Sequence, residues 1–288
     1  MRIAFQGAPG AYSEMAAQRA WAGVETVPCD QFEEVFAAVA AGKTSHGLLP
    51  IENSIGGSIH RNYDLLLEHD LPIVAETELQ VVHHLVALPG TELSQIRRVC
   101  SHPQALAQCE SFLRSLPNVE IVATYDTAGS ARLIRDQQLT DTAAVASARA
   151  AEIFGLDVLQ GAIQDYRDNI TRFLLVARDP QPLGTPDKTS VVFALPNAPG
   201  ALFKALSVFA LRDIDLTKLE SRPIRGRPWE YLFYVDLGLG RSDVRCSRAV
   251  VHLAESARWV KTLGSYARWN EAAMRTVVAE ASVDVSAV

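Results

Sequence analysis

The first 178 residues alternate short apolar runs with segments that have helical periodicity. Helical patterns begin at Ser13, at the capping-box pattern Asp30–Glu33 and at Pro103. The runs typical of strands are Arg2–Gln6, Gly47–Ile51, Arg98–Cys100, Val119–Thr124 and Ala143–Ala146. Because strands that alternate with helices form parallel sheets covered by helices, the pattern predicts an α/β fold.

Two longer apolar segments interrupt this alternation. Ile73–Leu88 contains no turn signal, and Asn169–Ala177 ends in a run typical of a buried strand. We interpret them as the outward and return crossings between two lobes, so that both segments line the cleft. The prediction is a domain over residues 1–178, with lobe one at about 1–75 and 165–178 and lobe two at about 76–164.

A second module follows a linker. Residues 179–187 hold three prolines and a glycine, which indicates a stiff connection. The next segments predict the order strand, helix, strand, strand, helix, strand, a ferredoxin-like βαββαβ module over residues 188–266. Residues 267–288 are predicted to be a tail.

Composition narrows the class of protein. The 288 residues are 48% hydrophobic and 21% charged, as in a soluble protein of about two domains. The net charge of -6, without a block of Lys and Arg, argues against nucleic-acid binding, and no apolar stretch reaches membrane length. The four cysteines are widely spaced and the N-terminus has no signal-peptide pattern, which predicts a reduced, cytoplasmic protein.

Polar loops follow four of the predicted strands. They are Gly7–Ser13, Glu52–Ser54, Ser101–Gln104 and Tyr125–Ser130. Open α/β sheets bind ligands at the carboxyl ends of their strands, so the coincidence predicts a ligand site. Each loop alone fits a helix cap or a tight turn equally well. The first loop lacks two glycines of the dinucleotide fingerprint, and no His, Asp and Glu cluster has the spacing of metal ligands.

Thr171 and Arg172 stand at the entry to the last buried strand of this domain. A hydroxyl and a permanent cation on a rigid element suit chemistry on an anionic substrate. The same pattern fits a strand entry with a solvated arginine.

Together these stretches resemble the monofunctional prephenate dehydratase family over roughly residues 1–266. The matching motifs are Gly7-x-x-Gly10-x-Tyr12-Ser13, Pro50–Ser54, Ser101–Gln104, Asp126–Thr127, Thr171–Phe173, Gly200–Phe203 and Glu220–Pro223. The resemblance implies a two-lobed catalytic domain similar to type II periplasmic binding proteins, followed by an ACT regulatory domain. It also implies decarboxylative dehydration of prephenate to phenylpyruvate in L-phenylalanine biosynthesis, without a cofactor or a metal.

The resemblance assigns residues to three groups. The catalytic group is Thr171, Arg172, Glu52 and His102. The substrate-binding group is Ser13, Asn53, Ser54, Thr127, Gln104 and Phe173. The group that binds phenylalanine as an allosteric effector is Asn197, Ala198, Gly200, Ala201, Leu202, Glu220, Ser221 and Arg222. Thr171 is expected to donate a hydrogen bond or relay a proton to the leaving hydroxyl, and Arg172 to hold a carboxylate or orient Thr171.

The resemblance further implies a homodimer or homotetramer built through the ACT and catalytic domains, with no nucleic-acid or membrane partner. Two alternatives stay open at this point. One is arogenate dehydratase, the same chemistry on the transaminated substrate. The other is a non-catalytic cytoplasmic amino-acid sensor with a binding-protein fold.

Overall fold

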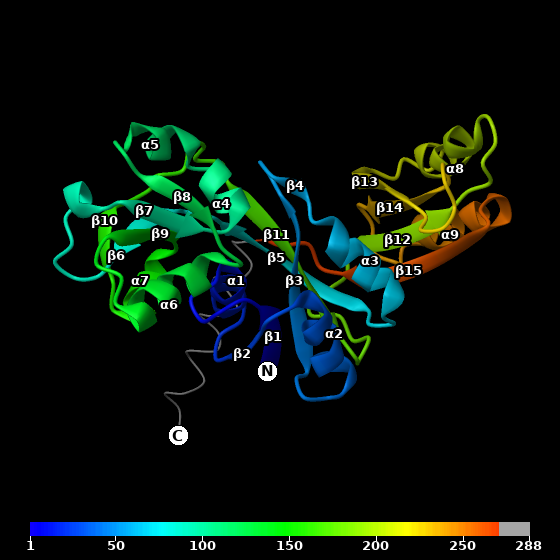
Figure 1. The fold of residues 1–288 in the computed structure, drawn as a ribbon. Helices are drawn as coiled ribbons and strands as arrows, with labels where there is room; N and C mark the ends of the chain where they lie inside the picture. The colour runs from blue at the N-terminus through cyan, green and yellow to red at the C-terminus, as the bar shows by residue number, and fades with distance from the viewer. Residues whose placement is uncertain (271–288) are drawn as a thin grey trace, which may run out of the picture. The chain divides into compact units, whose positions relative to one another are not determined.

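The computed structural model describes residues 1–270, which form two compact units (Figure 1). Unit 1 comprises residues 1–59 and 78–173, and unit 2 comprises residues 60–77 together with the chain from residue 174 onward. Most of the predicted tail, residues 271–288, lies outside the described part of the chain.

The first lobe of unit 1 is built on a parallel sheet in which β1 lies between β2 and β3. Its elements are β1 (Arg2–Gln6), α1 (Tyr12–Ala20), β2 (Glu25–Cys29), α2 (Phe32–Ala40), β3 (His46–Asn53) and the two-residue β4 (Gly57–Ser58). Phe5 and Phe36 are fully buried in this lobe. The predicted capping box at Asp30 is wrong. Gln31 occupies the N-cap of α2 without a side-chain bond, while the backbone N–H of Asp30 donates to Glu34.

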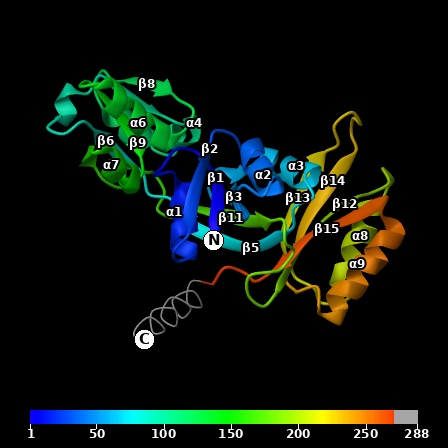
Figure 2. The same ribbon diagram turned by 90° about the horizontal axis from the view of Figure 1, so that it is seen from below.

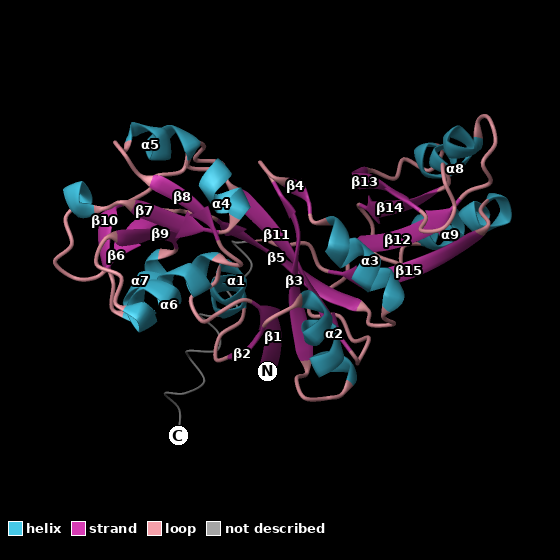
Figure 3. Cartoon of the chain, in the orientation of Figure 1, coloured by secondary structure: helices cyan, strands magenta, loops and turns pink. Residues whose placement is uncertain are grey.

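The second lobe carries five strands in the order β10-β6-β9-β7-β8, with helices on both of its faces (Figure 3). Its elements are β6 (His84–Ala87), the 3-10 helix η1 (Leu93–Gln95), β7 (Arg98–Ser101), α4 (Pro103–Ala107), α5 (Glu110–Ser115), β8 (Glu120–Ala123), α6 (Thr127–Gln137), β9 (Thr142–Ala146), α7 (Ala148–Phe154) and β10 (Asp157–Gln160). Strands β8, β7 and β9 are parallel, whereas β6 and β10 pair antiparallel. The predicted all-parallel arrangement therefore holds for only part of the sheet.

Two segments predicted as continuous are divided. The crossing Ile73–Leu88 is two strands, β5 (Ile73–Gln80) and β6, separated by Val81–His83. The return crossing is one strand, β11 (Ile170–Ala177), as predicted. The helix expected from Pro103 stops at Ala107, and α5 starts afresh at Glu110. This break places Gln108 and Cys109 between the two helices.

Unit 2 contains the βαββαβ module predicted from the sequence. Its elements are β12 (Lys188–Ala194), α8 (Ala201–Ala210), β13 (Leu216–Pro223), β14 (Tyr231–Leu237), α9 (Val244–Ser256) and β15 (Trp259–Tyr266). The antiparallel sheet has the order β13-β14-β12-β15, and α8 and α9 cover one face (Figure 2). Val191, Phe193, Phe209 and Leu253 lie in the core between sheet and helices.

One helix of unit 2 was not predicted. Helix α3 (His60–Glu68) comes from the amino-terminal half of the chain yet packs in this unit. The rings of Tyr63 and Tyr234 meet edge to face with centroids 5.0 Å apart, and the hydroxyl of Tyr234 donates to the carbonyl of Tyr63 over 3.0 Å. The short segment between Gly57 and Ile73 therefore carries a helix that contacts β14.

Candidate active site

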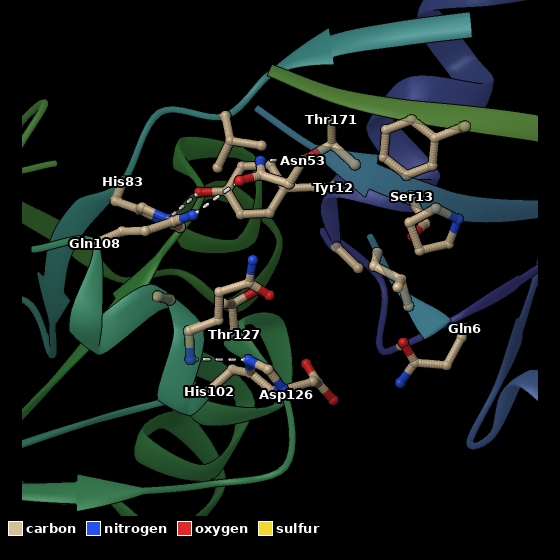
Figure 4. A pocket seen from close by; sticks show the side chains of 18 of the residues that line it. Gln6, Tyr12, Ser13, Asn53, His83, His102, Gln108, Asp126, Thr127 and Thr171 are labelled. Carbon is tan, nitrogen blue, oxygen red and sulfur yellow. Dashed lines mark hydrogen bonds between the residues drawn. The ribbon is translucent and has the colours of Figure 1, made fainter. Parts of the chain in front are cut away.

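A cavity of about 350 Å³ lies between the two lobes of unit 1 (Figure 4). The loops after β1, β3, β7 and β8 reach it, as do both crossing segments through Val81, His83, Thr171 and Phe173. The predicted site residues that line it are Ser13, Asn53, His102, Gln104, Thr127, Thr171 and Phe173. Glu52, Ser54 and Arg172 are not among the lining residues. The loops at the strand ends thus meet in one site.

The hydroxyl of Thr171 has a fixed acceptor role. Asn53 Nδ2 donates to Thr171 Oγ1 over 3.0 Å, and both side chains are buried. The orientation of the Asn53 amide follows from its other contacts, because Oδ1 accepts from the backbone N–H groups of Ile55 and Gly56 at 3.1 and 2.7 Å. Since Thr171 Oγ1 already accepts a hydrogen bond, its own proton is available to donate into the cavity.

A chain of buried side chains continues from Asn53 (Figure 4). Gln108 Nε2 donates to Asn53 Oδ1 over 3.2 Å, and Gln108 Oε1 accepts from Asn169 Nδ2 over 2.9 Å. His83 Nε2 lies 2.9 Å from the same Gln108 oxygen, which makes that nitrogen a donor. The other ring nitrogen of His83 lies 2.9 Å from the hydroxyl of Tyr12. Five side chains therefore hold the acceptor side of Thr171 in one arrangement.

Sequence reasoning missed four members of this chain. Tyr12 belongs to a motif that was noticed, but it was not assigned a role. His83 lies in a run interpreted as apolar, and Gln108 was given no interpretation. Asn169 carried the one usable sequence signal, because an amide directly before an apolar strand must find partners if it is buried, as it is in the structure.

Arg172 and Glu52 form an ion pair, with Arg172 Nη1 3.0 Å from Glu52 Oε1 and the arginine side chain 10% exposed. Their strands, β11 and β3, are those that carry Thr171 and Asn53. Ser54 joins the same strands, because its hydroxyl donates to the carbonyl of Asp168 and accepts from the N–H of Ile170. These three residues hold the two site strands together.

His102 and Gln104 come from the opposite lobe. His102 is the N-cap of α4, and its Nδ1 accepts from the backbone N–H of Gln104 over 3.2 Å. Burial lowers the pKa of His102, and the neighbouring Asp126 opposes this shift. Burial also lowers the pKa of His83. In both residues the lowered pKa favours the neutral imidazole.

The lining of the cavity is poor in charge. It contains no lysine or arginine among the described residues, and Asp126 is its one carboxylate. Donors for an anion are instead hydroxyl and amide groups and the first turns of α1 and α6, where Ser13 and Thr127 stand. The arrangement suits a small polar molecule whose reacting oxygen faces Thr171.

The predicted effector residues lie in unit 2. Asn197, Ala198, Gly200, Ala201 and Leu202 surround the start of α8, whereas Glu220, Ser221 and Arg222 lie on the edge strand β13. Strand register places the two stretches at one end of the sheet, because Leu232 pairs with both Ala194 and Arg222. Arg222 is already engaged, since Nη2 contacts both carboxylate oxygens of Asp64 on α3 at 3.0 and 2.9 Å.

Among residues 1–270, no group of three or more His, Cys, Asp and Glu is arranged to hold a metal ion. In the same part of the chain, no helix is long and apolar enough to span a membrane.

Two packed lobes with a small cavity between them, in whose wall the Thr171 hydroxyl lies, define an α/β protein built to hold a small molecule. The chain belongs to the prephenate dehydratase family, whose family model matches residues 3–181. The predicted family, dehydratase activity and α/β fold are therefore confirmed.

The similarity to known proteins extends over nearly the whole chain. Arogenate dehydratase/prephenate dehydratase 2, chloroplastic, of Arabidopsis thaliana is 51% identical over 92% of this chain and 72% of its own length. The structure of prephenate dehydratase from Arthrobacter aurescens in complex with L-Phe is 32% identical, with a TM-score of 0.85 over 99% of this chain and all of that one. A structure described as GqqA, a novel type of quorum quenching acylase, is 36% identical, with a TM-score of 0.85 over 93% of this chain and 98% of that one.

The expected cytoplasmic location is contradicted. The Arabidopsis relative above and two further relatives from the same plant are chloroplastic by name, so the comparisons do not support a cytoplasmic location. The expectation rested on widely spaced cysteines and on an N-terminus without a signal-peptide pattern. Free cysteines distinguish a reducing compartment from an oxidising one, but they do not tell two reducing compartments apart.

Proposed function

We propose that this chain converts prephenate to phenylpyruvate with Thr171 as the group that assists departure of the ring hydroxyl. The observation that carries the proposal is the hydrogen bond from Asn53 Nδ2 to Thr171 Oγ1, which leaves the threonine proton to donate into the cavity. A positioned donor stabilises the charge that develops on a leaving oxygen. Residues 1–178, with the two lobes given above, would be the catalytic domain.

The reaction consumes one proton. The bond between ring carbon 1 and its carboxylate breaks, carbon dioxide leaves, and the electron pair enters the ring. That pair expels the hydroxyl on carbon 4, which takes a proton through Thr171 and departs as water. Solvent restores the threonine proton, and the products are phenylpyruvate, carbon dioxide and water. Formation of the aromatic ring supplies the driving force for the reaction. The enzyme therefore needs only to position one proton donor at the leaving hydroxyl and to exclude other orientations of the substrate.

The remaining predicted residues support this step. Glu52 and Arg172 hold β3 against β11 and so fix Asn53 relative to Thr171, as does Ser54. Gln104 and His102 present polar groups from the opposite lobe, and Ser13 and Thr127 offer hydroxyls at helix starts. Phe173 provides an apolar wall for the ring.

We infer that residues 188–266 form an ACT domain that binds phenylalanine as an allosteric effector. The support is the βαββαβ order, the placement of both predicted motifs at one end of the sheet, and the L-Phe bound to the Arthrobacter relative.

We also propose a homodimer or homotetramer. Phe203 on α8 and Leu211 at its C-cap are 77% and 79% exposed, which is apolar surface that a second subunit would cover, and light scattering would measure the mass.

Replacing Thr171 by alanine tests the catalytic role. Thr171→Ala is expected to lower kcat about a hundredfold, because one positioned donor is lost, with a much smaller change in KM. Thr171→Ser keeps the hydroxyl and is the matched control. The measurement is the formation of phenylpyruvate from prephenate, followed by its absorbance. An alanine variant within a few-fold of wild type would remove Thr171 from the mechanism.

The same assay separates the alternatives. A sensor would bind the substrate without turnover. An acylase such as the GqqA relative needs an activated nucleophile. In the described residues, no serine or threonine of the cavity hydrogen-bonds a histidine, which favours the dehydratase.

A further inference from the structure

We propose that Asp126 selects the amino group of arogenate and so sets the substrate preference of this site. The inference rests on the proposed dehydratase function and adds the residue that distinguishes the two substrates. It starts from the charge of the cavity, in which one carboxylate stands among neutral polar groups.

The two substrates differ in charge at one position. Prephenate carries two carboxylates and a keto group, so it brings two negative charges to the cavity. Arogenate carries an ammonium group in place of the keto oxygen, so its side chain is a zwitterion. With no lysine or arginine among the described lining residues, a dianion meets no compensating side-chain charge beside Asp126. An ammonium group beside Asp126 converts that repulsion into an ion pair.

The arrangement of substituents on the substrate ring places the ammonium or keto group on the side of the cavity where Asp126 lies. The leaving hydroxyl is on carbon 4, while the ring carboxylate and the side chain are both on carbon 1, at the opposite end of the ring. With the hydroxyl at Thr171, the carbon 1 substituents point away from Asn53 and Thr171. Figure 4 shows Asp126, Thr127 and His102 on the far side of the cavity from Thr171.

Asp126 has a free oxygen for such a contact. It is the N-cap of α6, and its Oδ1 accepts from the backbone N–H of Gly129. In the described part of the chain, Oδ2 accepts no hydrogen bond and no cation forms an ion pair with Asp126. Arg132 lines a neighbouring cavity together with Asp126 but does not line this one. The carboxylate therefore has both a structural role, through Oδ1, and an unused acceptor, Oδ2.

Asp126→Asn separates these two roles. Asparagine caps helices about as well as aspartate, so the bond to Gly129 survives while the charge is removed. The measurement is kcat/KM of the full-length protein on arogenate and on prephenate. The ratio of the arogenate value to the prephenate value is expected to fall about tenfold or more, the effect of losing one charge-assisted hydrogen bond to the ammonium group, which prephenate lacks. Asp243→Asn, the same change at the N-cap of α9, is the control.

The two kcat/KM values decide whether Asp126 selects the amino group. A selective loss on arogenate supports the assignment. Equal losses on both substrates would show that Asp126 only caps α6, and this result would overturn the assignment. An unchanged ratio would also overturn it, as would a wild-type enzyme that prefers prephenate more than tenfold. A wild-type protein that turns over neither substrate refutes the proposed dehydratase function instead, so the two failures are distinguishable.

Discussion

At the scale of single residues, the site depends on side-chain amides whose orientation is forced. Backbone N–H groups fix Asn53, Asn53 fixes the donor end of Gln108, and Gln108 fixes which nitrogen of His83 carries a proton. Buried polar groups are costly to leave unpaired, so each member stabilises the orientation of the next. The orientation of Thr171 is thus determined by residues from both lobes.

Gln108→Glu tests this dependence with almost no change in size. A carboxylate still accepts from Asn169 and His83 but does not donate to Asn53 Oδ1, so two acceptors face each other in a buried site. We expect kcat to fall about tenfold to a hundredfold at pH 8. Activity should recover in part as the pH is lowered, because the protonated carboxyl regains a donor.

The control for that experiment is Gln80→Glu, which changes an exposed amide that donates to the carbonyl of Arg167 outside the chain of buried side chains. The pH profile distinguishes an orienting role from simple damage to the fold. A variant whose loss of activity is the same at every pH would contradict the forced-orientation account.

At the scale of elements, periodicity predicted most of unit 1 and all six elements of the βαββαβ module. It failed where tertiary contacts decide. Ile73–Leu88 divides into two strands because Val81–His83 turns from one lobe to the other, which apolar periodicity does not register. Helix α3 was missed because a buried position such as Tyr63 packs against Tyr234, on a strand distant in sequence. The site strands were predictable, but their buried amides were not, since each partner lies on a different element.

Helix α3 gives the element-scale prediction. If Arg222 binds the carboxylate of phenylalanine, the effector must compete with Asp64, which holds the guanidinium through two oxygens. Asp64→Asn removes the competing charge, and phenylalanine affinity should rise about threefold to tenfold. Titration calorimetry measures the Kd. Asp70→Asn, which removes the exposed partner of Lys261, is the control. If Asp64→Asn binds phenylalanine no more tightly than the wild-type protein, Arg222 does not receive the effector.

At the scale of the whole molecule, the chain passes between the two units close to the site. Strand β11 carries Thr171 and Phe173 in unit 1 and continues as unit 2 from Leu174. Helix α3 of unit 2 begins directly after Ile59, which lines the cavity. The segments that join the two units therefore lie within a few covalent bonds of residues that line the cavity, so a change at α3 or at the end of β11 would reach the proposed site through the backbone.

The last prediction concerns the coupling of the two sites. A ligand shifts an equilibrium only by its differential affinity for the two states, and coupling between binding sites is reciprocal. Phenylalanine should therefore weaken substrate binding by the same factor by which substrate weakens phenylalanine binding, about fivefold to a hundredfold. A tight-binding prephenate analogue that cannot lose carbon dioxide makes the test possible with the wild-type protein, because it stays intact during a titration. Calorimetry in both orders gives the two factors. If the saturating analogue leaves the affinity for phenylalanine unchanged, the effector does not act through substrate binding, and any inhibition must arise in the chemical step alone.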